Sequence, residues 1–313
     1  MTPSNSDEQI AAYLARIRPF HLDLAIDDLQ VNTEGLVNDV LIVNGAHVFR
    51  FPKADWAVAH MRQEAACLTL ARRHVAVPLP AWRTYDDEFI SYDLIPGVAL
   101  QRHHVLTGSA AAQHALAAQI GGFLRALHAI PLAEVSAAGI GPSVTNRTRE
   151  RWLQFYTDVQ AQLFPLLMQF SRDWVHHHFA PVVANPDFLA HAPALINGDL
   201  GPYHLLYNPD TGLLNGIIDF GTAGTGDPAV DFACLLDQYG ETFVRRVARH
   251  YPGFDARLLD RARFWAGTLQ LQWLLGGLRN PDDPSWFAVH VGRARDVLPV
   301  GAGWEKMHDD ETR

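Results

Sequence analysis

The chain has 313 residues, of which 48% are hydrophobic and 19% are charged, and its formal net charge at pH 7 is −9. Such a composition is ordinary for a globular protein large enough to form two lobes. An acidic chain offers no electrostatic basis for binding nucleic acid or an anionic membrane. Residues 1–20 lack the pattern of a secretory signal, and no stretch approaches the roughly 18 consecutive apolar residues of a membrane span. We therefore expect a cytoplasmic protein, monomeric or dimeric, that binds a cationic small molecule and neither nucleic acid nor membranes.

The first hundred residues contain short strand patterns around one helix. An Asn-Gly pair at residues 44–45, between two apolar runs, predicts a tight hairpin, because both residue types tolerate the positive φ that such turns need. Apolar residues recur at helical spacing over residues 55–73, which predicts a helix with Asp55 at its N-cap. A further strand is expected over residues 88–95, where a Pro-Gly pair follows it.

Helical patterns dominate after residue 97. Residues 111–130 carry an apolar stripe at helical spacing, and long helical patterns continue over residues 149–179 and 258–280. The change in pattern predicts an α+β chain with two lobes. We expect a small β-rich N-terminal lobe over residues 1–97 and a larger helical C-terminal lobe over residues 98–313.

The cysteines and a run of three histidines are the first residues to consider as reactive or metal-binding groups. Cys67 and Cys234 lie within apolar, helix-like runs and are predicted to be core residues rather than a disulfide or a zinc site. His176, His177 and His178 are consecutive, and neighbouring residues on a helix point in different directions. We therefore expect all three histidines to be exposed rather than to bind a metal.

Residues 195–232 carry four aspartates of interest, Asp199, Asp219, Asp227 and Asp231, among apolar runs and turns. The pattern over residues 204–218 predicts a β-hairpin, which places Asp199 and Asp219 at the same end of it. A glycine at 221 lets the backbone turn sharply after the second aspartate. Two carboxylates there suit a metal-bound phosphate, one as a magnesium ligand and the other orienting a hydroxyl. A single aspartate in this setting is more often a plain turn residue, but four at these spacings favour the functional interpretation.

The same segment resembles a known family. "NGDLGPYHLL" followed by "IIDFGTAGTGDPAVDFA" is similar to the catalytic core of the aminoglycoside phosphotransferase family, in which an Asn usually follows the first Asp by five residues and another Asp follows after fifteen more. Here Asp199 to His204 is five and His204 to Asp219 is fifteen. The resemblance implies a protein-kinase-like fold and a phosphoryl transfer in which Asp199 is the catalytic base. Asp219 would bind Mg²⁺, and ATP or GTP would be the co-substrate.

The resemblance extends to the N-terminal lobe. Arg50, in "FRFPK", matches the basic residue that contacts the nucleotide phosphates, with Lys53 as second choice, and Glu64 matches its acidic partner on the following helix. Taken alone, Arg50 and Glu64 are equally well interpreted as a surface ion pair of little energetic value. The remaining nucleotide-binding residues that the resemblance implies are a loop glycine, a gate residue and two main-chain contacts to the base: Gly35, Tyr92, Asp93 and Ile95.

Two residues depart from the usual family pattern. His204 stands where most members have Asn, and imidazole is a poorer ligand than an amide oxygen for a hard ion; the 2''-type aminoglycoside and macrolide branches also have His there, and the resemblance assigns His204 to the metal site. Asn197 replaces the usual first His of the motif and is expected to support the loop by hydrogen bonding. Asp227 is interpreted as structural, and Asp231 as an anchor that accepts main-chain N–H bonds from the catalytic loop.

The acceptor is expected to be a hydroxyl compound. The helical patterns are most similar to the 2''-type aminoglycoside branch, which favours an aminoglycoside antibiotic. Asp237 and Glu241 are candidates for binding ammonium groups and Trp273 for a stacking wall. A solvated helix end and a core tryptophan explain these three residues equally well.

Other interpretations of the chain remain open at this point. The acceptor could be a macrolide or another small metabolite, or the chain could bind a nucleotide without transferring phosphate. "GTGDPA", starting at Gly224, formally fits a dinucleotide-binding fingerprint. That interpretation fails because only helices, and no second parallel strand, are predicted to follow it.

Overall fold

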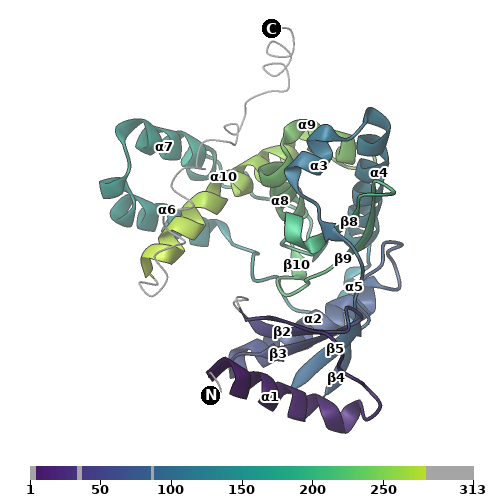
Figure 1. The fold of residues 1–313 in the computed structure, drawn as a ribbon. Coiled ribbons are helices and arrows are strands. Elements are labelled where there is room, and N and C mark those ends of the chain that lie inside the picture. The colour runs from purple at the N-terminus through teal and green to yellow at the C-terminus, as the bar shows by residue number, and fades with distance from the viewer. Residues whose placement is uncertain (1–4, 34–36, 86–87, 280–313) are drawn as a thin grey trace.

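The structure is a computed structural model and describes residues 5–33, 37–85 and 88–279. A sheet with two long helices lies at the N-terminal end, and a larger, mainly helical part follows it (Figure 1). This agrees with the predicted α+β, kinase-like arrangement of a β-rich and a helical lobe. Within the described residues, no helix is long and apolar enough to cross a membrane.

The N-terminal sheet is antiparallel, with the strand order β1-β2-β3-β5-β4. Its strands are β1 (Leu29–Asn32), β2 (Asn38–Val43), β3 (His47–Pro52), β4 (Arg83–Tyr85) and β5 (Phe89–Asp93). The predicted hairpin joins β2 to β3, and its turn residues Asn44 and Gly45 have φ of 54° and 58°. Only glycine and asparagine adopt this left-handed conformation readily, so the Asn-Gly pair fixes the register of the two strands.

Two helices belong to the sheet region, α1 (Asn5–Ile17) and α2 (Asp55–Ala71), with a short 3-10 turn, η1 (Arg18–Phe20), after the first. Tyr13 of α1 stacks on Phe51 with ring centroids 4.2 Å apart, which fastens α1 to the sheet. The predicted helix α2 is present, but its N-cap is Ala54, without a side-chain cap. Asp55 is the first helical residue instead, where its charge still complements the helix dipole.

The C-terminal part contains most of the helices and three short strand pairings. Its helices are α3 (Arg102–Thr107), α4 (Ala110–His128), α5 (Leu132–Ala137), α6 (Arg149–Gln162), α7 (Gln169–Ala184), α8 (Ala229–Tyr239), α9 (Glu241–Ala248) and α10 (Ala256–Arg279), with 3-10 turns η2 (Phe164–Leu166) and η3 (Pro202–His204). Its strands are β6 (Val98–Ala99), β7 (Ala194–Ile196), β8 (Leu205–Asn208), β9 (Leu213–Ile217) and β10 (Gly224–Gly226). β6, β8 and β9 form one small sheet, and β7 pairs with β10.

The helices pack around one large apolar core. The predicted stripe of α4 is buried, as are both cysteines, which are free thiols. α10 packs along α8 and also contacts α6 and α7, which project to one side of the molecule (Figure 1). α2 contributes Cys67, Leu68 and Leu70 to this same core, although it precedes residue 97. The proposed lobe boundary at residue 97 stays a prediction.

The prediction for the three histidines of α7 is wrong at one position. His176 and His177 are exposed, but His178 is fully buried and its Nε2 hydrogen-bonds the carbonyl of Phe264 at 2.8 Å. The side chain fills the space over Gly267 of α10, where an added Cβ would lie 2.4 Å from the imidazole ring. His178 is therefore a core residue of the α7–α10 contact.

Candidate active site

The predicted hairpin of residues 195–232 is present as β8 and β9, and it brings three site residues together. His204 Nδ1 lies 3.6 Å from Asp199 Oδ2, and His204 Nε2 lies 3.6 Å from Asp219 Oδ2. Both carboxylates are partly exposed, with 51% of the Asp199 side chain and 40% of the Asp219 side chain accessible. The imidazole thus stands between two accessible carboxylates at one end of the hairpin.

The hydrogen bond of His204 decides which ring nitrogen is free. Nδ1 lies 2.7 Å from the main-chain carbonyl oxygen of Asp199. Because a carbonyl only accepts, Nδ1 must carry the proton. In the neutral ring the lone pair is then on Nε2, the nitrogen that faces Asp219. A backbone hydrogen bond of this kind is the usual way in which a ligating histidine is oriented.

Asp219 has an unusual backbone conformation. Its φ is 62°, in a left-handed region that few residues other than glycine adopt, and strained residues of this kind cluster at functional sites. Its Oδ1 accepts the N–H of Gly221 at 3.0 Å. Burial acts to raise the pKa of Asp219, but His204, Arg50 and the Gly221 N–H outweigh it and hold the pKa below its usual range. The group is therefore an anion well suited to hold a cation.

Asp199 differs from Asp219 in its electrostatics. Partial burial of the Asp199 carboxylate raises its pKa, and the nearby charges of Asp219 and Asp231 act in the same direction, although His204 acts to lower it. Its main-chain N–H donates to Asn197 Oδ1 at 3.0 Å. A carboxylate with a raised pKa is a better proton acceptor than its neighbour with a lowered one. The two aspartates therefore have different chemical characters.

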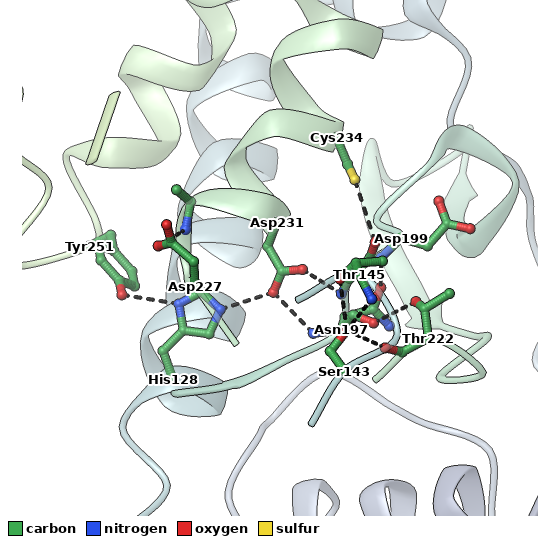
Figure 2. A network of polar contacts seen from close by, with 12 residues as sticks. His128, Ser143, Thr145, Asn197, Asp199, Thr222, Asp227, Asp231, Cys234 and Tyr251 are labelled. Carbon is green, nitrogen blue, oxygen red and sulfur yellow. Dashed lines mark hydrogen bonds and ion pairs between the residues drawn. The ribbon is translucent and has the colours of Figure 1, made fainter. Parts of the chain in front are cut away.

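The Asp231 carboxylate holds the loop that carries Asp199 by hydrogen bonds, as predicted (Figure 2). Asp231 is fully buried, and its carboxylate accepts the main-chain N–H of Asn197 at 3.1 Å and that of Gly198 at 2.6 Å. The Asn197 side chain donates to the carbonyl of Asp219 at 2.8 Å. Asn197 therefore supports the loop by hydrogen bonding, as expected, and links it to the Asp219 segment.

Asp227 is structural, as predicted. It forms an ion pair with Arg261 at 2.7 Å, and its Oδ1 accepts the N–H of Ala229 at 3.0 Å. The helix begins at Ala229, with Pro228 as its N-cap. The carboxylate therefore fastens the start of α8 to α10.

The predicted cation and its acidic partner meet between β3 and α2. Arg50 donates to both oxygens of Glu64, at 3.1 and 3.4 Å, and the N–H of Phe220 donates to Glu64 Oε1 at 3.0 Å. Glu64 is buried, which raises its pKa although Arg50 lowers it, while Glu64, Tyr92 and Asp219 together raise the pKa of Arg50 against the effect of burial. Because the pair is buried and bidentate, it is not the surface ion pair of little energetic value that the alternative interpretation assumed.

Lys53 makes different contacts from Arg50. Its Nζ donates to the carbonyl of Thr33 at 2.6 Å and lies 3.2 Å from Asp39 Oδ1. Its main-chain N–H donates to the carbonyl of Val37 at 3.0 Å. Lys53 therefore binds both ends of the loop between β1 and β2. Gly35, predicted within that loop, lies outside the described residues.

An aromatic neighbour of Arg50 was not anticipated. The guanidinium lies over the ring of Trp82, 5.1 Å from its centroid, and Trp82 stacks on Tyr92 with centroids 6.5 Å apart. Burial raises the pKa of Tyr92 to about 12, so its hydroxyl stays neutral. Trp82 lies in an irregular segment before β4, where no periodic pattern marks its direction. Its sequence context carries no signal that could have identified it.

The predicted base-binding segment follows β5. Asp93 and Ile95 line a cavity of about 430 Å³, together with residues 78–81 and Asn215. The Asp93 carboxylate lies 3.3 Å from His47 Nδ1 and is exposed. Gly216 allows Ile95 to approach β9, because a Cβ there would lie 2.7 Å from Ile95 Cγ2. The contact of these main-chain groups with a purine stays a prediction.

Comparison with known proteins identifies the family. The model of the phosphotransferase enzyme family (APH) matches residues 28–265, which include every site residue described so far. This chain belongs to that family. As a member of the phosphotransferase family it has the kinase-like fold, and it is a phosphotransferase whose acceptor is a hydroxyl group.

Individual relatives agree with this membership. The viomycin phosphotransferase of Streptomyces vinaceus is 30% identical over 202 residues, which cover 64% of this chain and 67% of that protein. The structure of the GDP and kanamycin complex of APH(2")-IIIa is 29% identical, with a TM-score of 0.80 over 91% of this chain and 97% of the other. A macrolide 2'-phosphotransferase type I is 20% identical, with a TM-score of 0.72 over 95% and 99%, and shares the fold.

Asp219 and His204 are the candidates for holding a metal ion in this phosphotransferase. Among the residues that the structure describes, no group of three or more His, Cys, Asp and Glu could hold a metal ion. Mg²⁺ is usually bound by one or two carboxylates together with phosphate oxygens and water. The anionic, accessible Asp219 fits such an ion, and His204 Nε2 faces the same place.

The three predicted acceptor-binding residues have different environments. Asp237 of α8 is partly exposed, and its Oδ2 accepts from Gln238 at 2.6 Å. Trp273 of α10 is 41% exposed. Glu241 is only 7% exposed, and both its oxygens accept from Arg263, at 2.7 and 3.0 Å. The prediction for Glu241 is therefore wrong, because its carboxylate is already occupied in an internal ion pair between α9 and α10.

Proposed function

We propose that this phosphotransferase transfers the terminal phosphate of a purine nucleoside triphosphate to a hydroxyl of a cationic antibiotic of the aminoglycoside class. The observation that supports it best is the group Asp199, His204 and Asp219 at one end of a hairpin, beside the buried Arg50–Glu64 pair. Relatives near 30% identity include a viomycin phosphotransferase and a kanamycin complex of APH(2")-IIIa. The bound GDP of the latter favours GTP over ATP as co-substrate.

The residues have separate roles in this proposal. Asp199 accepts or orients the proton of the attacking hydroxyl, a task that its raised pKa favours. Arg50 contacts the nucleotide phosphates, and Glu64 holds the guanidinium in place. Asp219, with His204, would hold Mg²⁺, which supplies charge neutralisation on the phosphates. Because phosphoryl transfer has a loose transition state, most of the catalysis is positioning and electrostatic stabilisation.

Several finer assignments belong to the same proposal. Lys53, the main-chain groups of Asp93 and Ile95, and the Tyr92 side chain would complete the nucleotide site. The acceptor would meet Asp237 and Trp273, whose carboxylate and indole suit ammonium groups and a sugar face. The lobes would divide at residue 97, and the enzyme would act in the cytoplasm. A macrolide or another small hydroxyl metabolite is the alternative acceptor.

The test is a panel of acceptors with two nucleotides. Aminoglycosides, viomycin, macrolides and small polyols are incubated with ATP or GTP and Mg²⁺, and phosphorylated product is measured by mass spectrometry. We expect product with a cationic antibiotic and a rate lower by about 10²- to 10⁴-fold in Asp199→Ala. Asp210→Ala is the matched control, because Asp210 lies in the exposed turn at the other end of the same hairpin. Product that never exceeds the Asp199→Ala background would refute the proposal and favour a nucleotide-binding protein without transferase activity.

A further inference from the structure

A series of hydrogen-bonded side chains, Tyr251, His128 and Asp231, leads to the loop of Asp199 (Figure 2). Tyr251, in the segment after α9, has its hydroxyl 3.0 Å from His128 Nδ1. His128 Nε2 lies 2.9 Å from Asp231 Oδ2. The side chains of His128 and Asp231 are 3% and 0% exposed. The side chains of Tyr251, His128 and Asp231 form no hydrogen bond with the side chains of Asp199, His204 and Asp219.

The direction of each hydrogen bond follows from the chemistry of the groups. The Asp231 carboxylate already accepts two main-chain N–H groups, from Asn197 and Gly198. A carboxylate anion only accepts, so His128 Nε2 must be the N–H donor of the third bond. In the neutral ring, Nδ1 then accepts the hydroxyl proton of Tyr251. Tyr251 therefore selects the tautomer in which His128 Nε2 donates a hydrogen bond to Asp231.

The loop has little freedom on its other side. Gly198 has a φ of +84°, and a Cβ there would lie 3.0 Å from Thr222 Oγ1 and 3.1 Å from Thr145 Oγ1. The next N–H, that of Asp199, is bound by Asn197 Oδ1. The backbone before Asp199 is thus held between the Asp231 carboxylate and two close hydroxyls. A small rotation of the Asp231 carboxylate would move the loop and the carboxylate of Asp199 with it.

We propose that His128 and Tyr251 are positioning residues of this phosphotransferase, acting on Asp199 through Asp231. This inference rests on the proposed function, in which Asp199 meets the acceptor hydroxyl. Loss of the imidazole would leave a buried carboxylate one donor short, and such a group reorients to find another partner. Arg50 and Glu64, on β3 and α2, take no part in the hydrogen bonds of Tyr251, His128 and Asp231, so we expect nucleotide binding to change less than the rate of transfer.

The kinetic test separates positioning from plain stability. In His128→Leu we expect kcat to fall on the order of 10²-fold, the effect of a small misplacement of a catalytic group, with the KM values of nucleotide and acceptor changed less than about twofold. His128→Gln keeps an amide donor and recovers about tenfold of that loss, and Tyr251→Phe lowers kcat by about threefold to tenfold, the value of one hydrogen bond. His178→Gln is the control, because it alters another buried histidine that bonds a carbonyl away from the loop.

A second readout needs no activity. Hydrogen exchange of the peptide covering residues 195–204 is followed by mass spectrometry, and we expect faster exchange at the amides of Asn197 and Gly198 in His128→Leu and Tyr251→Phe, but not in the control. An unchanged kcat with unchanged exchange would overturn the inference, as would a loss of kcat that merely parallels the loss of stability in His178→Gln. If the wild type phosphorylates no acceptor, the proposed function fails. The hydrogen-exchange rates of the variants then decide by themselves whether Tyr251 and His128 hold the loop.

Discussion

His178 allows a quantitative prediction about stability and pH. The imidazole lies between the rings of Trp174 and Phe264, at centroid distances of 4.7 and 5.2 Å, and none of it is exposed. Nε2 donates its proton to the carbonyl of Phe264, and the buried Nδ1 has no hydrogen-bond partner. A proton added to Nδ1 would find neither an acceptor nor water. Burial therefore lowers the pKa of His178 to about 4, although the Phe264 carbonyl acts to raise it.

The size of the effect follows from the two states of the chain. In the unfolded chain the residue titrates near its ordinary pKa of about 6.5, so the unfolded chain takes up the proton first as the pH falls. The contribution of the neutral, buried His178 to the free energy of unfolding is fully present above pH 6.5 and is lost as the pH falls toward 4. At about 1.4 kcal/mol per pH unit, the free energy of unfolding decreases by about 2 kcal/mol at pH 5 and about 3 kcal/mol at pH 4 from this residue alone.

Urea unfolding at pH 7 and pH 5, followed by circular dichroism, measures the contribution. The decrease in unfolding free energy between these pH values should be about 2 kcal/mol smaller in His178→Gln than in the wild type. His177→Gln is the matched control, because His177 is the preceding residue of the same helix and is exposed. It should show the wild-type decrease. Equal decreases in all three proteins would refute the reasoning from burial.

Three further substitutions test the site and the packing. Glu64→Gln removes the charge that holds Arg50, and we expect kcat/KM for the nucleotide to fall on the order of 10²-fold; an unchanged value would contradict the proposed role of the pair. His204→Asn should retain activity with Mg²⁺, because an amide oxygen ligates a hard ion, and complete loss would assign the histidine another role. Gly121→Ala should lower the unfolding free energy by about 1–3 kcal/mol, since its Cβ would lie 2.6 Å from a carbonyl of α9. In Gly122→Ala, where the space is open, calorimetry should find no such loss.

Local patterns were sufficient to predict the elements that form the candidate site. The Asn-Gly turn, the apolar stripe of α4 and the turn of the β8–β9 hairpin each follow from a few consecutive residues. Once the hairpin is assigned, its geometry alone places Asp199 and Asp219 at one end. The pairing of Arg50 with Glu64 followed from their places on a strand and the next helix in the family pattern. These features depend on short-range chemistry or on a motif with fixed spacing.

The features that were missed depend on contacts distant in sequence. Glu241 lies about one helix beyond Asp219 along the chain. Its partner Arg263 comes from the next long helix, α10, 22 residues later. His178 turns inward because α10 provides a glycine beside it. Trp82 joins the site only because the sheet brings it over Arg50. No periodicity within α7, α9 or the segment before β4 encodes these neighbours.

Helix α2 connects the two halves of the candidate site. Glu64 Oε1 accepts both from Arg50 of β3 and from the N–H of Phe220, the residue after Asp219. The preceding residue of the same helix, Gln63, donates to the carbonyl of Ala223 at 2.8 Å. If Arg50 and Asp219 hold the nucleotide phosphates and the metal as proposed, a displacement of α2 would disturb both at once. The apolar face of α2 lies in the large helical core, so the packing of that core fixes the distance between Arg50 and Asp219. Substitutions in that core would then change nucleotide affinity without touching the nucleotide.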